Sequence, residues 1–89
     1  MRAIRIEKFG GPEVLQLVDI EKPIAGENEV LIRVVAAGIN YADTHQTEDS
    51  YLAPQQLPLI PGAEVVGFDS EGKRVVALVP GGGYAEFVA

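Results

Sequence analysis

The sequence predicts a small, mostly β domain of the barrel or sandwich type that carries one short helical turn. Three observations lead to this prediction: apolar and polar residues alternate over short runs, Gly and Pro residues interrupt these runs, and no segment has the pattern of a long helix. The 89 residues fit one domain, and a hydrophobic fraction of 47% argues against intrinsic disorder. Short strands joined by Gly/Pro turns are typical of small barrels and sandwiches.

The first two predicted strands cover residues 3–7 and 14–20. In the first strand the alternation places Ile4 and Ile6 on one face, which we expect to be buried, and Ala3 on the other face. A turn with two glycines and a proline joins the strands, because these residues allow or fix the backbone angles that turns need. We therefore expect the chain to begin with two half-buried strands.

The strongest predicted strand covers residues 30–36, which are apolar except for one arginine. Small and polar residues follow it, and Asn40 is a good N-cap because its side-chain oxygen can accept an N–H from the first turn of a helix. A short helical turn over 41–46 is expected. Residues 47–58 then read as a long loop, in which Tyr51 either pins the loop to the domain or contacts a ligand.

Residues 64–68 and 73–79 are predicted to form a hairpin, with Gly72 in the left-handed position of its tight turn. Positions 75–79 are all apolar, so we expect this strand to be covered on both faces. Residues 84–88 alternate again and form the last predicted strand. If that strand has no partner, its free edge should pair between chains and cause self-association.

Composition excludes several classes of function. A net charge of −6 argues against nucleic acid and against anionic membrane surfaces as partners, since both need clustered Lys and Arg. The absence of cysteine excludes disulfides and thiolate chemistry, and His45 is the single histidine, so no metal site is expected. No apolar run is long enough for a spanning helix and no signal peptide is evident, so we expect a soluble, cytoplasmic protein.

Two stretches organise the chain, 36–43 and 59–67, because in each an apolar segment meets small and polar residues. Strand ends brought side by side at these stretches would form the mouth of a cleft. Local structural roles compete with this interpretation: Asn40 would cap a helix, and Asp43 would bond to nearby backbone. No catalytic group is identified by the residues alone. The polar lining of the cleft would consist of Asn40, Tyr41, His45 and Tyr51.

The ordered motifs resemble the zeta-crystallin-like quinone oxidoreductases, a branch of the medium-chain dehydrogenase/reductase superfamily. The motifs are FGGPEVL at 9–15, GENEV at 26–30, AAGINYAD at 36–43, PGAE at 61–64, GKRV at 72–75 and GGYAE at 82–86. The resemblance implies a GroES-like, partly open β-barrel in which residues 1–89 form the N-terminal part of the catalytic domain. It also implies that NADPH lies between this domain and a nucleotide-binding domain, which this chain lacks.

The resemblance further implies a zinc-independent hydride transfer from NADPH to a quinone or an enone. Zinc-dependent relatives carry a cysteine at the position of Asn40 and a histidine at the position of Ala63, so zinc is not expected here. Asn40, with its neighbour Tyr41, would face the cofactor, and Tyr51 matches a tyrosine in the loop over the site. Asp43 and His45 are candidates for the substrate cleft, His45 at the position of a proton-relay histidine in zinc alcohol dehydrogenases.

The expected partners are the missing nucleotide-binding domain and a small quinone or enone. Without that domain the chain should bind no NADPH and should be inactive, because no glycine-rich strand-to-helix unit is present to hold a pyrophosphate. Two alternatives remain open. The chain could be a free-standing GroES-like binding or interaction module, or an engineered structural fragment without activity.

Overall fold

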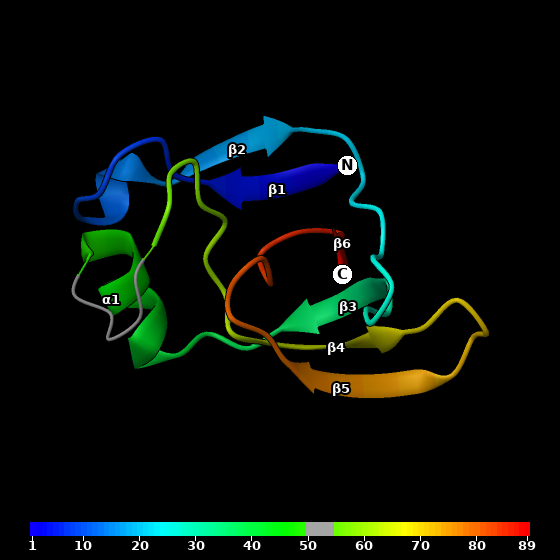
Figure 1. Cartoon of the computed structure of the whole chain (residues 1–89). Helices are drawn as coiled ribbons and strands as arrows, with labels where there is room; N and C mark the ends of the chain where they lie inside the picture. The colour runs from blue at the N-terminus through cyan, green and yellow to red at the C-terminus, as the bar shows by residue number, and fades with distance from the viewer. Residues whose placement is uncertain (50–54) are drawn as a thin grey trace.

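The computed structural model describes residues 1–49 and 55–89 as mainly antiparallel β structure with a helix at one end (Figure 1). The predicted mainly β class with a short helix is confirmed. No helix in the described parts of the chain has the length and apolar character needed to cross a membrane. The elements in chain order are β1 (Arg2–Arg5), a 3₁₀ turn (Pro12–Val14), β2 (Gln16–Asp19), β3 (Ile32–Ala37), α1 (Tyr41–Glu48), β4 (Glu64–Phe68), β5 (Arg74–Leu78) and β6 (Phe87–Val88).

The strands form two antiparallel sheets. β1 pairs with β2, with Arg2 opposite Asp19, and the second sheet has the strand order β5-β4-β3-β6. In Figure 1 the β1–β2 pair lies above the larger sheet, α1 lies at one end, and the turn between β4 and β5 projects at the other. The sheets are therefore open at their outer strands, β2 and β5, rather than closed into a full barrel.

The segment that leads into β6 links the two sheets. The N–H of Ile4 donates to the carbonyl of Tyr84 at 2.8 Å, and the N–H of Val34 donates to the carbonyl of Glu86 at 2.8 Å. Within β6, Phe87 pairs with Arg33 of β3. The expectation that residues 84–88 lack a partner is therefore wrong, because hydrogen bonds from β1 and β3 occupy this segment, and neither partner is near it in sequence.

The core lies on the inner face of the larger sheet. Ile32, Val65 and Val88 are buried there, and half-buried aliphatic side chains of β3 to β5 pack against them. In the predicted first strand, residues 3–7, the burial differs from the expected alternation: Ile6, which follows β1, is fully buried, but Ala3 is buried as well. Ala3 is covered because it bridges Ala85 of the linking segment, a contact that the local pattern cannot reveal.

The hairpin of β4 and β5 forms as predicted, but one face of β5 is open. β4 has the predicted bounds, and Gly72 adopts a left-handed conformation with φ 81°. In β5, however, Val76 is 78% exposed and Leu78 is 84% exposed. The prediction of cover on both faces is wrong, because β5 is an outer strand whose alternate residues, such as Ala77, are the ones that pack on the core.

The helix is longer than the predicted turn of residues 41–46. α1 continues through Glu48. Thr47, predicted as the first residue of the loop, therefore belongs to the helix, and it is buried. Asp49 ends the helix in the left-handed conformation with φ 62°, a position that glycine usually occupies. The predicted loop therefore begins after the helix, and its aromatic residue Tyr51 lies outside the described residues.

Candidate functional site

The end of β3 and the start of β4 lie side by side. The N–H of Gly38 donates to the carbonyl of Glu64 at 3.1 Å, and Nδ2 of Asn40 donates to Oε1 of Glu64 at 3.0 Å. A Cβ at Gly38 would lie 2.0 Å from that same carboxylate oxygen, so a larger residue there would force the side chain of Glu64 to move away. The two stretches singled out in the sequence therefore do meet.

Hydrogen bonds between Asn40 and Asp43 stabilise the first turn of α1. Asn40 is the N-cap, with extended φ and ψ of −126° and 154°. Oδ2 of Asp43 accepts the N–H of Asn40 at 3.0 Å, and the N–H of Asp43 donates to the carbonyl of Asn40 at 2.9 Å. The position of Asn40 as the N-cap and the bond from Asp43 to nearby backbone are confirmed, although the N–H of Asp43 donates to the backbone carbonyl of Asn40 rather than to its side-chain oxygen.

Asp43 also joins the helix to the far end of the chain. The hydroxyl of Tyr84 donates to Oδ2 of Asp43, which is only 5% exposed. Burial, the hydrogen bond to Asp43 and the negative charge of that carboxyl, in this order, raise the pKa of Tyr84 well above its ordinary value. Oδ1 of Asp43 is buried and accepts no hydrogen bond from the described residues. A buried carboxylate oxygen without a donor is rare in folded proteins.

Gln46 fixes the other side of α1. Its side chain is 1% exposed; Nε2 donates to the carbonyl of Pro80 at 2.9 Å, and Oε1 accepts the N–H of Gly62 at 3.1 Å. The segments that precede β4 and follow β5 are thereby tied to one helical side chain. The N–H of Tyr84 donates to the carbonyl of Pro61 at 3.0 Å and locks the same region.

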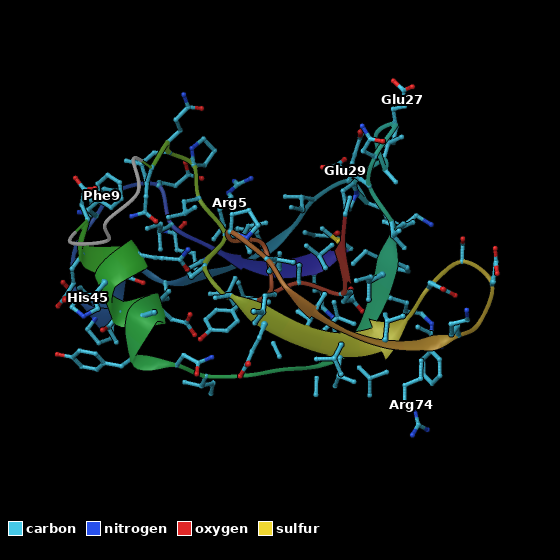
Figure 2. All side chains as sticks on the ribbon, turned by 60° about the horizontal axis from the view of Figure 1, so that its bottom comes forward. Arg5, Phe9, Glu27, Glu29, His45 and Arg74 are labelled. Atoms are coloured by element: carbon cyan, nitrogen blue, oxygen red, sulfur yellow. The ribbon has the colours of Figure 1, made fainter. Side chains whose placement is uncertain are left out.

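Tyr41 and His45 lie on a different side of α1 from Asn40 and Asp43. Tyr41 is 78% exposed, and its ring meets the half-buried ring of His45 edge-on, with 4.8 Å between the ring centroids. Figure 2 shows His45 at the same end of the molecule as Phe9. The predicted site residues therefore form two groups: Asn40 and Asp43, of which Asp43 is buried and Asn40 half-buried, and Tyr41 and His45, of which Tyr41 is exposed and His45 half-buried. The fifth, Tyr51, lies outside the described residues.

A cavity of about 270 Å³ opens between the loop after β1 and α1. Its wall includes Pro12, Leu15 and Ile39 together with Asp43 and Tyr84. The loop is held against the helix because the N–H of Gly10 donates to the carbonyl of Thr47 at 2.9 Å.

Three residues of this region were not identified as site residues in the sequence: Gln46, Glu64 and Tyr84. Glu64 and Tyr84 each read as the start of a strand, and Gln46 as one polar residue in a helical turn. Each acts through a partner far along the chain, so no local pattern distinguishes it. For Glu64 one signal was available, because it lies within residues 59–67, the second of the two stretches in which an apolar segment meets small and polar residues.

The described residues offer little for a metal or for the phosphates of a dinucleotide. They contain no group of three or more His, Cys, Asp or Glu residues that could hold a metal ion. The glycines at 81–83 join β5 to β6, whereas phosphate-binding loops run from a strand into a helix. What the arrangement does provide is the buried carboxyl of Asp43 and the exposed ring of Tyr41 on one helix, and an exposed ring can contact a small molecule.

Comparison with known proteins identifies relatives of this arrangement. The model of the alcohol dehydrogenase GroES-like domain matches residues 26–89. The quinone oxidoreductase of Lama guanicoe is 43% identical over 99 aligned positions, which cover 98% of this chain and 30% of the relative. The solved quinone oxidoreductase of Thermus thermophilus is 48% identical, with a TM-score of 0.89 over 99% of this chain and 29% of that one.

A third relative supports the same assignment. The Escherichia coli quinone oxidoreductase, solved as a complex with NADPH, is 34% identical with a TM-score of 0.89, over 99% of this chain and 30% of that one. The chain therefore spans about 30% of the length of these relatives. The predicted GroES-like fold is confirmed. This chain belongs to the alcohol dehydrogenase GroES-like domain family, in the quinone oxidoreductase branch of the medium-chain dehydrogenase/reductase superfamily.

Proposed function

We propose that residues 1–89 form the N-terminal part of the catalytic domain of an NADPH-dependent quinone oxidoreductase. The observation that carries the proposal is 48% identity over 99% of the chain to the Thermus thermophilus quinone oxidoreductase, which has also been solved in complex with NADPH. In this reaction bound NADPH supplies a hydride, and a quinone or an enone accepts it. The contribution of this chain is to orient groups and exclude water on one side of the reacting pair.

The residues described in the structure do not fit the pyrophosphate part of NADPH. Besides lacking a glycine-rich strand-to-helix unit, they place the acidic side chain of Asp43 at the N-terminus of α1, where a phosphate would otherwise be attracted. The chain has a net charge of −6, which adds no attraction for a dinucleotide. A nucleotide-binding domain is therefore the proposed partner, and the isolated chain is proposed to be inactive.

Roles for the predicted site residues follow from their exposure. We retain Asn40, Tyr41 and Tyr51 as proposed cofactor-side residues, and Asp43 and His45 as substrate-side candidates. Tyr41 suits direct contact because its ring is exposed, and His45 is its half-buried neighbour, with 4.8 Å between the ring centroids. Asn40 and Asp43 are engaged with Glu64 and Tyr84, so they suit the positioning of α1.

Zinc independence is part of the proposal. At the two positions where the resemblance places zinc ligands, the chain has Asn40, whose amide nitrogen is engaged by Glu64, and Ala63, which has no donor atom. Zinc sites need thiolate, imidazole or carboxylate ligands. Elemental analysis of the purified protein, and activity after dialysis against a chelator, test this point; stoichiometric zinc with loss of activity on its removal would contradict it.

The cytoplasmic location stays a prediction from the sequence.

Three measurements test the proposed function. The first is a fluorescence titration of the 89-residue chain with NADPH, for which we expect no saturation; a micromolar dissociation constant would contradict the proposed need for a partner domain. The second is the reading frame beyond codon 89 in the gene, where we expect a βαβ unit with a glycine-rich turn. A protein that contains both parts should oxidise NADPH when 1,4-benzoquinone is added. Its failure to do so would refute the proposed activity.

A further inference from the structure

The outer edge of β5 carries a free row of backbone hydrogen-bonding groups. At one end of the β4–β5 ladder the N–H of Val79 donates to the carbonyl of Ala63 at 2.8 Å. At the other end the N–H of Asp69 donates to the carbonyl of Lys73 at 2.9 Å. Bonded pairs alternate along an antiparallel ladder, so the odd-numbered residues of β5 face β4. The N–H and carbonyl groups of residues 74, 76 and 78 therefore point away from β4, toward the side where β5 has no neighbouring strand (Figure 1).

The strand Arg74–Leu78 lacks the usual protection of a sheet edge. Natural edges are commonly protected by a proline, a bulge or several charges. The register between β4 and β5 runs without a shift, and β5 contains no proline and one charged residue, at its first position. The side chains of Val76 and Leu78 are exposed beside this edge. An added strand would therefore gain backbone hydrogen bonds and would also cover apolar side chains.

The face of β4 and β5 that points away from the core is complementary to itself. Its cross-strand pairs, from one end to the other, are Phe68–Arg74, Val66–Val76 and Glu64–Leu78. One end is therefore basic, the middle is apolar and the other end is acidic. A two-fold axis beside Val76 makes β5 antiparallel to its own copy and sets Arg74 opposite Leu78 of the second copy. This arrangement joins the apolar middles, keeps the two arginines at opposite ends, and turns the basic end of each copy toward the acidic end of the other.

We propose that β5 pairs with β5 of a second copy of this chain, antiparallel about a two-fold axis beside Val76, so that one sheet runs through both copies. The outward groups of residues 74, 76 and 78 in one copy bond to those of residues 78, 76 and 74 in the other. The contact uses the same edge of both copies, so the assembly closes at the dimer. A second copy is the occupant because the row that supplies the free hydrogen-bonding groups also supplies the matching charges. The proposal does not depend on NADPH or on turnover.

Analytical ultracentrifugation of the 89-residue chain measures the pairing, and two substitutions at Val76 separate backbone pairing from apolar contact. Val76→Pro removes the outward N–H and leaves the bonds to β4 in place, whereas Val76→Thr keeps the N–H and removes apolar surface. We expect a dimer whose dissociation constant rises at least about tenfold in Val76→Pro, which loses two hydrogen bonds per dimer, and by less than about threefold in Val76→Thr. The opposite order of the two variants, or species larger than a dimer, would overturn the proposal. A monomer at millimolar concentration would overturn it too, and would leave the edge to a strand of another protein.

Single cysteines test the register without a proline in the strand, since the chain contains no cysteine of its own. Facing residues of a bonded antiparallel pair have Cα atoms about 5.5 Å apart, within the range that a disulfide spans. Mild oxidation of Val76→Cys should therefore give a covalent dimer. Leu78→Cys is the matched control at a similarly exposed site, where the two cysteines lie about 13 Å apart along the strands and should not cross-link. Cross-linking of Leu78→Cys as fast as of Val76→Cys, or of neither variant, would refute the proposed pairing.

Discussion

Replacing Gln46 with leucine should destabilise the protein, because two backbone groups lose their partner. The N–H of Gly62 belongs to a buried residue that water does not reach, and leaving such a group unpaired costs about 1–3 kcal/mol. Pro80 is exposed, so its carbonyl can bond to water instead. Leucine adds apolar burial that offsets about 1 kcal/mol. The expected net loss is about 1 kcal/mol, at the centre of a range of about 0–2 kcal/mol, and each kcal/mol lowers the midpoint of thermal unfolding by about 4–8 °C in a domain of this size.

Urea unfolding followed by circular dichroism measures this loss. The matched control is Gln16→Leu, the same substitution at an exposed residue of β2, for which we expect a change within about 0.5 kcal/mol. The slope of free energy against urea should stay constant, which shows that the folded state rather than the unfolded chain has changed. If Gln46→Leu and Gln16→Leu are equally stable, the tie from α1 to the two loops contributes nothing and the reasoning fails.

Three further changes test other parts of the structure. Asp49→Gly should stabilise the protein by about 0.5–1 kcal/mol, because φ is 62° at this helix end; a decrease in thermal midpoint would contradict this. Tyr84 has a raised pKa in the folded state, so its hydroxyl contributes stability that is present below its ordinary value of 10.0 and is lost as the pH rises further. Denaturation at pH 8 and pH 11 should show this loss in the original protein and not in Tyr84→Phe. We expect self-association to occur through the open edge of β5, where Val76 is exposed. Analytical ultracentrifugation should show less association for Val76→Lys than for Ser70→Lys, which makes the same substitution at an exposed residue of the hairpin turn. Equal association of the two variants would rule out that edge.

Local chemistry was sufficient for much of the fold. The spacing and composition of residues 64–79 predicted the hairpin and the observed bounds of β4, and the turn residues predicted the left-handed Gly72. Asn40 was identified as the N-cap from its residue type and its place before a polar turn. These features depend on residues within a few positions of one another, where backbone preference and side-chain capping act directly.

Features that depend on distant partners could not be predicted in this way. Tyr84 meets Asp43 across 41 positions of the chain, and Gln46 meets Pro80 across 34. The apolar run in β5 has the composition of a doubly covered strand, yet Val76 is exposed, because strand order decides which face meets the core.

The sequence by itself determined the family, the β class, the turns and the position of the helix cap, since each is written in neighbouring residues or in the order of motifs. Tertiary structure alone decided that Asp43 is buried while Tyr41 is exposed, although both belong to the same short helix. It also created the cavity beside α1 and left Oδ1 of Asp43 without a hydrogen-bond donor among the described residues. The physical reason is that burial and hydrogen-bond pairing are properties of the assembled sheets, set by which strands lie beside one another.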